Sequence, residues 1–152
     1  RMTIAAGAPA PTVWDNKAHR RTGAIGYDVI APKDDDRHDY RAIYDASGSS
    51  DVIDILMTRL GRQGEIVLAG FYASRISFAF PAAFQREACL RVAAEWQPED
   101  LAATHTLIES GALNLSGLVT DVAPASEACT AYPTAFEDQD CLKLVLDWRE
   151  LA

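Results

Sequence analysis

The fold is decided by residues 11–15, Pro11-Thr12-Val13-Trp14-Asp15, a short apolar strand that ends on a carboxylate. Further apolar runs, each followed by a turn signal, predict strands over residues 27–31, 41–45 and 65–70. In the last of these the apolar run is continuous, which is typical of a strand covered on both faces. Helical patterns lie between the strands. This alternation predicts an α/β fold, with a parallel sheet, helices on both of its faces and right-handed crossovers.

The remaining elements follow from periodicity and from proline and glycine signals. A helix over residues 52–60 places Val52, Ile55 and Leu56 at helical spacing, which predicts an apolar face. Residues 75–80 alternate apolar and polar side chains, as an edge strand does. The sequence also predicts helices over 84–87, 98–110 and 124–136 and strands over 89–93, 118–122 and 142–148. Pro133 should break the third of these helices near its end.

The carboxylate of Asp15 is the first candidate for a ligand contact. In a dinucleotide-binding (Rossmann) domain, an acid at the end of the second strand binds the 2′-hydroxyl of the adenine ribose. It follows the first glycine of a G-x-G-x-x-G turn by roughly 20 residues, and counting back from Asp15 passes Arg1. We therefore expect a fragment whose domain lacks its first strand and Gly-rich turn. The alternatives are a plain helix cap at Asp15 and a complete small protein that begins on a helix.

Other candidate cofactor residues lie near strand ends. Asp15 would favour NAD over NADP because a carboxylate repels a 2′-phosphate. Arg20 lies beside it, and its alternative role is a solvated charge. Ser47 and Gly48 follow the strand over 41–45, at the edge where parallel sheets bind ligands, and Gly48 would allow close backbone approach. An ordinary strand-to-helix turn explains these two residues equally well.

Composition narrows the class of protein. The 152 residues carry a formal net charge of −8, which argues against nucleic acid or an anionic membrane surface as a partner. No apolar run approaches the ~18 residues that a membrane span needs. Three distant cysteines predict free thiols in a reducing compartment, the cytoplasm. There is no C-x-x-C or H-x-x-x-H pattern, so we predict no metal site built from these residues alone.

Five segments, in this order, carry a family resemblance across nearly the whole chain. They are the strand ending at Asp15, Asp45-Ala46-Ser47-Gly48, Gly64–Gly70, Leu107–Gly111 with Leu118-Val119-Thr120, and Asp140–Leu146. Together they resemble the C-terminal half of the medium-chain dehydrogenase/reductases, the alcohol dehydrogenase superfamily. The resemblance implies an incomplete dinucleotide-binding domain over residues 1–112. Residues 113–152 would then be a strand-helix-strand that returns to the catalytic domain.

The resemblance also implies further contacts. Ala69, Gly70 and Phe71 would contact the nicotinamide half of NAD, and Lys143 would reach the pyrophosphate, although a solvated lysine is an equal alternative. Catalytic residues would precede Arg1, so none is assigned here. Arg75–Phe80 would pair with its copy in a homodimer. The alternative for this aromatic-rich region is a platform for a macrocycle.

Within the superfamily, residues 5–14, 44–48 and 68–72 are similar to the members that act in bacteriochlorophyll synthesis, a pathway of photosynthesis. That similarity implies NAD-dependent oxidation of the 3-(1-hydroxyethyl) group of a bacteriochlorophyllide, a tetrapyrrole, to 3-acetyl. A dehydrogenase for a small alcohol or polyol, and a non-catalytic nucleotide-binding or assembly module, remain alternatives.

A missing first strand would have structural consequences. In the usual 3-2-1-4-5-6 order this strand is central, so its loss leaves two rows of unpaired backbone groups. NAD affinity should fall without the glycine turn, and we expect the fragment alone to be inactive. Residues 1–31 would lose their order, the gap would close, or a strand would come from another copy. We predict repair between copies.

Overall fold

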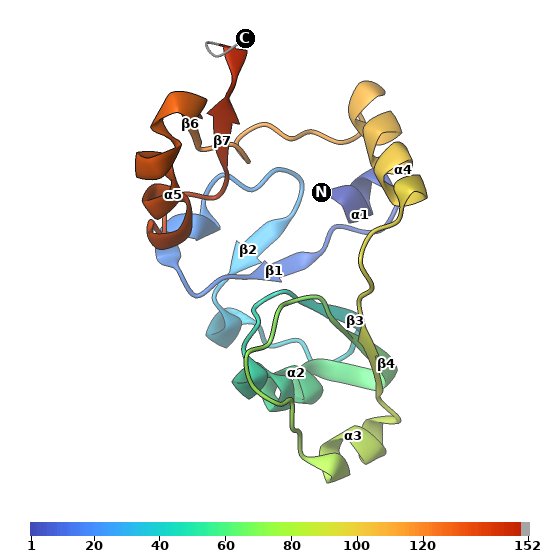
Figure 1. Cartoon of the computed structure of the whole chain (residues 1–152). Coiled ribbons are helices and arrows are strands. Elements are labelled where there is room, and N and C mark those ends of the chain that lie inside the picture. The colour runs from blue at the N-terminus through green and yellow to red at the C-terminus, as the bar shows by residue number, and fades with distance from the viewer. Residues whose placement is uncertain (150–152) are drawn as a thin grey trace. The chain divides into compact units, whose positions relative to one another are not determined.

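The computed structural model describes residues 1–149 and divides into two compact units (Figure 1). Unit 1 combines residues 1–34 with the described residues from 98 onward, and unit 2 is Asp35–Gln97. Each unit is built on parallel strands.

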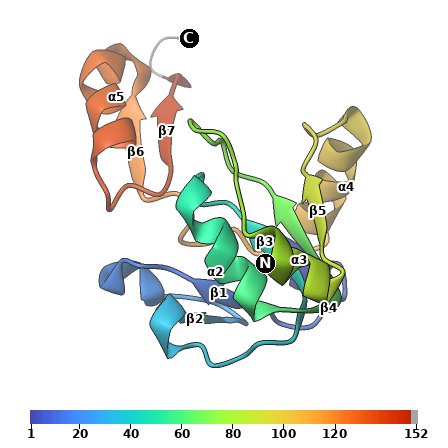
Figure 2. The same ribbon diagram turned by 90° about the horizontal axis from the view of Figure 1, so that it is seen from below.

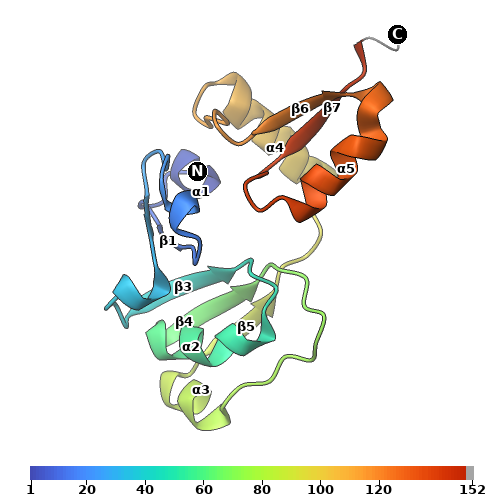
Figure 3. The same ribbon diagram turned by 90° about the vertical axis from the view of Figure 1, so that its left-hand side faces the viewer.

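Unit 2 is a three-stranded parallel sheet in the order β3-β4-β5. Its strands are β3 (Tyr40–Asp45), β4 (Leu60–Leu68) and β5 (Cys89–Val92), and its helices are η3 (Ser50–Val52), α2 (Ile53–Arg59) and α3 (Phe80–Arg86). Figure 3 shows α2 and α3 on the same side of this sheet. The large side chains with relative exposure below 2% all lie in α2 and β4: Ile53, Met57, Leu60, Ile66 and Val67. This unit therefore holds the main core of the chain.

Unit 1 holds two separate pairs of parallel strands. They are β1 (Thr12–Trp14) with β2 (Asp28–Ile30), and β6 (Asp121–Pro124) with β7 (Leu144–Asp147). The helical segments are α1 (Met2–Ala5), η1 (Ala18–Arg21), η2 (Pro32–Asp34), α4 (Pro98–Glu109), η4 (Ala125–Glu127) and α5 (Ala128–Glu137). In Figures 2 and 3, α5 lies beside β6 and β7. The buried apolar residues of this unit are mostly small, with Leu113 as the largest.

The predicted fold class is confirmed. All the strand pairs are parallel, and helices alternate with strands along the chain. The pairings are those expected of Rossmann strands 2-3 and 4-5-6.

Three element predictions need correction. Arg75–Phe80 is not a strand: residues 75–79 form neither helix nor strand, and Phe80 is the first residue of α3. Pro81 stands at the start of that helix, where proline is well tolerated. The strand predicted at 118–122 begins only at Asp121, after a turn with Gly117 at φ +75°. Pro133 does not end α5, which continues to Glu137.

Candidate functional site

Five of the eight predicted cofactor residues lie where β3 and β4 end, at the same edge of the parallel sheet: Ser47, Gly48, Ala69, Gly70 and Phe71. Asp45, the last residue of β3, organises this edge and is only 6% exposed. Its Oδ1 accepts the Ser47 N–H at 2.9 Å, and its backbone carbonyl accepts the Ala69 N–H at 2.8 Å. The turn after β3 is thereby connected to the end of β4.

Two glycines bring the turns after these strands into direct backbone contact. A Cβ built on Gly48 would lie 2.5 Å from the Phe71 carbonyl oxygen, and one built on Gly70 would lie 2.6 Å from the Gly48 nitrogen. Gly48 also has φ +70°, a region that disfavours other residues. Both positions therefore require glycine. Gly48 thus lies against the backbone of the segment that follows β4.

The surface beside the glycine contact is open to solvent. The Phe71 side chain is fully exposed, at 101% of its reference area. Ser47 is also exposed, and its Oγ accepts the Ser49 N–H at 3.1 Å.

Asp45 and Tyr72 are site residues that were not predicted from the sequence. The Tyr72 hydroxyl donates to Asp45 Oδ2 at 2.7 Å. Burial, and then the hydrogen bond to Asp45, raise the pKa of the Tyr72 phenol to about 12. Tyr72 therefore stays a neutral donor at physiological pH. One sequence signal could have identified Asp45: like Asp15, it is a carboxylate at the point where a strand ends.

In unit 1, Asp15 follows β1 directly and is half-buried. Its Oδ1 accepts the Lys17 N–H at 2.7 Å, and its backbone carbonyl accepts a hydrogen bond from Arg21 Nη1 at 2.9 Å. Asp15 thus closes a local turn over residues 15–17. It is not a helix cap, because η1 has Lys17 as its N-cap residue and no side-chain cap hydrogen bond. One carboxylate has several acceptor positions, so the bond to Lys17 does not prevent a second hydrogen bond.

A loop near the C-terminus contacts the basic segment that follows Asp15. Arg20 Nε donates to the Gln139 carbonyl at 2.8 Å, and Lys17 Nζ donates to the Gln139 side chain. His19 Nε2 lies 2.8 Å from Asp140 Oδ1. The Arg20 guanidinium is therefore hydrogen-bonded to the backbone carbonyl of Gln139. Lys143 is exposed one residue before β7, where its backbone bonds to Thr120.

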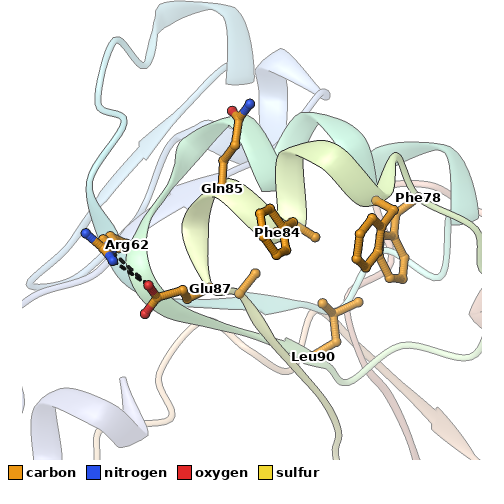
Figure 4. A pocket seen from close by; sticks show the side chains of 9 residues that line it. Arg62, Phe78, Phe84, Gln85, Glu87 and Leu90 are labelled. Carbon is orange, nitrogen blue, oxygen red and sulfur yellow. Dashed lines mark hydrogen bonds and ion pairs between the residues drawn. The ribbon is translucent and has the colours of Figure 1, made fainter.

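A separate apolar groove of about 580 Å³ lies against α3 and β5 in unit 2 (Figure 4). Phe78, Phe84 and Leu90 contribute much of its apolar lining. An ion pair between Arg62 and Glu87 lies at one end, where it lowers the pKa of the Glu87 carboxyl. Phe84 is 70% exposed, so this apolar surface is open to solvent.

The part of the chain that the structure describes contains no candidate metal site and no candidate membrane span. Across residues 1–149, no three or more His, Cys, Asp or Glu side chains are grouped so that they could hold a metal ion. No helix within that range is long and apolar enough to cross a membrane. The three cysteines are free thiols.

The chain is similar to two dehydrogenases of known name. It is 60% identical over 152 residues to the 2-desacetyl-2-hydroxyethyl bacteriochlorophyllide A dehydrogenase of Cereibacter sphaeroides, covering 100% of this chain and 48% of the relative. The protein of the same name from Rhodobacter capsulatus is 59% identical over 150 residues. That match covers 99% of this chain and 48% of the relative. The chain thus spans about half the length of these relatives. No family profile matches it.

Solved structures share the fold at low identity. L-idonate 5-dehydrogenase from Escherichia coli superposes with a TM-score of 0.80 at 18% identity, covering 93% of this chain and 43% of the other. A short chain alcohol dehydrogenase from Escherichia coli, complexed with the cofactor NADH, superposes with a TM-score of 0.81 at 16% identity. The match covers 95% of this chain and 47% of the other. These comparisons confirm the resemblance drawn from the sequence. The chain is a homologue of bacteriochlorophyllide dehydrogenases, matched over about half of their length, and has the fold of the medium-chain alcohol dehydrogenases.

Proposed function

We propose that the protein containing this chain is an NAD-dependent dehydrogenase that oxidises the 3-(1-hydroxyethyl) group of a bacteriochlorophyllide to 3-acetyl, and that this chain supplies cofactor contacts. The observation that carries the proposal is 59–60% identity, over essentially the whole chain, to dehydrogenases named for a hydroxyethyl bacteriochlorophyllide. When bound, NAD⁺ would accept the hydride from the carbinol carbon. The hydroxyl proton would pass to a base outside these residues, leaving the carbonyl of the acetyl group.

The geometry supports a nucleotide contact in each unit. Asp15, half-buried at the end of β1, would accept hydrogen bonds from the adenine ribose. In unit 2, Ser47, Gly48, Ala69, Gly70 and Phe71 would contact the rest of the cofactor from the edge of β3 and β4. The NADH complex of a structural relative supports a nicotinamide cofactor. Arg20 and Lys143 would supply positive charge toward the adenosine and the pyrophosphate.

Substitution of Asp15 tests the cofactor assignment in the full-length protein. Asp15→Asn keeps an acceptor for the Lys17 N–H but removes the charge that excludes a 2′-phosphate. We expect NADH affinity to fall by about tenfold, as for loss of a charged hydrogen bond, and discrimination against NADPH to narrow. Fluorescence titration with NADH and NADPH measures both.

The matched control is Asp28→Asn, because Asp28 begins β2 and so lies at the opposite end of the strand pair. It should leave both affinities unchanged. If Asp15→Asn and the wild type bound NADH and NADPH with equal affinities, the role of Asp15 in ribose binding would be contradicted. Formation of NADH from small alcohols, but not from the pigment substrate, would favour the small-alcohol alternative.

We also propose that residues 75–80, with the groove against α3, form a homodimer contact. Phe78, Phe80 and Phe84 are exposed at 40%, 67% and 70%, and apolar surface of this extent is typical of an interface. Light scattering of the full-length protein tests this: Phe84→Ser should shift a dimer toward monomer. A wild-type monomer would rule the contact out.

A further inference from the structure

The turn after β3 and the segment after β4 are joined by one side-chain hydrogen bond. Asp45 Oδ2 accepts the Tyr72 hydroxyl at 2.7 Å, and the hydroxyl also lies 3.3 Å from the Asp45 carbonyl oxygen. The other carboxylate oxygen holds the Ser47 N–H. One buried carboxylate therefore restrains both turns at this edge of the sheet.

The joined segments need such a restraint. Residues 69–79 belong to no helix or strand in the described structure, so no ladder of hydrogen bonds fixes the backbone at Phe71. Yet this backbone lies so close to Gly48 that a single added carbon would clash. A contact of that kind persists only where neighbouring interactions hold both sides in place.

The charge and burial of the pair make its bond costly to break. Asp45 is 6% exposed, so removing its donor would leave a carboxylate poorly solvated. The Tyr72 pKa of about 12 keeps the donor protonated over the whole physiological range. The phenol is thus protonated, and able to donate, throughout that range.

We propose that Asp45 and Tyr72 are a pair of positioning residues: their hydrogen bond holds Gly48 against Phe71 and so sets the surface that binds the nicotinamide cofactor. The identity of the ligand that binds this surface, a nicotinamide cofactor, rests on the proposed function. Neither side chain needs to touch the cofactor. Their effect is transmitted through the backbone of the two turns.

Two measurements on the full-length protein test the pair. Tyr72→Phe removes the hydroxyl and keeps the ring, and Asp45→Asn removes the charge. In each variant we expect amide hydrogen exchange to accelerate about tenfold in peptides covering residues 45–50 and 69–72, and the NADH dissociation constant to rise about tenfold. In the double variant the loss of affinity should be close to that of the worse single variant, because both changes act on the same hydrogen bond.

The control variant is Tyr44→Phe. Tyr44 precedes Asp45 in β3 and is 64% exposed, so loss of its hydroxyl should change neither measurement. Unchanged exchange and unchanged NADH affinity in Tyr72→Phe would overturn the proposal, as would fully additive losses in the double variant. If the wild type itself fails to bind NADH, the proposed function is overturned. Exchange, which needs no cofactor, then decides separately whether the pair fixes the turns.

Discussion

At the scale of single residues, Asp15 and Asp45 show one local motif in two environments. Asp15 directly follows β1 and Asp45 is the last residue of β3. Each side chain accepts the backbone N–H of the residue two positions later, at 2.7 Å from Lys17 and 2.9 Å from Ser47. Asp45 is also buried and bonded to Tyr72, whereas Asp15 is half-buried. The local turn therefore follows from residue type. The difference in burial leaves Asp15 better placed to meet a ligand.

Gly48 gives a prediction about stability. Gly48→Ala would place a Cβ 2.5 Å from the Phe71 carbonyl oxygen at φ +70°. We expect it to lower the free energy of unfolding by about 2–4 kcal/mol, from backbone strain and steric overlap together. Urea denaturation of both variants measures this. Gly117→Ala is the control, because φ is +75° there but no atom lies within 4 Å. Equal losses in the two variants would show that the Phe71 contact has no energetic effect.

Tyr72 gives a prediction about pH. Its pKa rises from 10.0 to about 12, chiefly through burial and then through Asp45. The pKa of Tyr72 is higher in the folded than in the unfolded protein, so the protonated phenol stabilises the fold. This stabilisation is complete below about pH 10 and is lost between about pH 10 and 12. The difference in unfolding free energy between wild type and Tyr72→Phe should therefore be constant from pH 7 to about 10, and then shrink. If urea titrations showed this difference in unfolding free energy already decreasing below about pH 9, the buried, Asp45-bonded environment assigned to Tyr72 would be contradicted.

At the scale of elements, burial distinguishes correct predictions from wrong ones. The continuous apolar run of β4 is buried as expected, with Ile66 and Val67 at 0% and 1% exposure. In α2, however, Ile53, Leu56 and Met57 face the core, and Ile55 is 52% exposed. Helical periodicity allowed more than one apolar face in this segment, and the position of the sheet selected one of them.

The orientation of α2 can be tested by a pair of neighbouring substitutions. Leu56→Ala should lower the unfolding free energy by about 2–5 kcal/mol, because it removes a 4%-exposed side chain from the core. Ile55→Ala should change it by less than about 1 kcal/mol. Thermal or urea unfolding with circular dichroism measures both. A larger loss at Ile55 than at Leu56 would mean that the helix packs through its other face.

At the scale of the whole molecule, the strands form separate sheets. Within unit 1 β1 pairs with β2, and within unit 2 β3 pairs with β4, so each of these small sheets has edge strands. β5 likewise pairs with β4. Open strand edges are sites at which other chains add by hydrogen bonding.

These edges lead to a prediction about association. The 152-residue chain on its own should self-associate at micromolar concentration, because edge strands of separate copies can pair by hydrogen bonding. Light scattering across a concentration series measures the average mass. The full-length protein, run beside it, should reach a defined mass that does not grow with concentration. A monomeric 152-residue chain would contradict the prediction that copies repair the sheet.

The sequence by itself determined the order and type of most elements and the parallel α/β class, because strand alternation, turn residues and buried runs are encoded within short windows. Five predicted site residues also meet at one sheet edge for this reason: parallel strands end together. Only the tertiary structure decided that Tyr72 bonds Asp45, 27 residues away, and that Arg20 bonds the Gln139 carbonyl, 119 residues away. Arg75–Phe80 failed as a strand on the same ground, since alternation becomes a strand only where a partner supplies hydrogen bonds. Such contacts depend on which surfaces packing brings together, and local patterns do not carry that information.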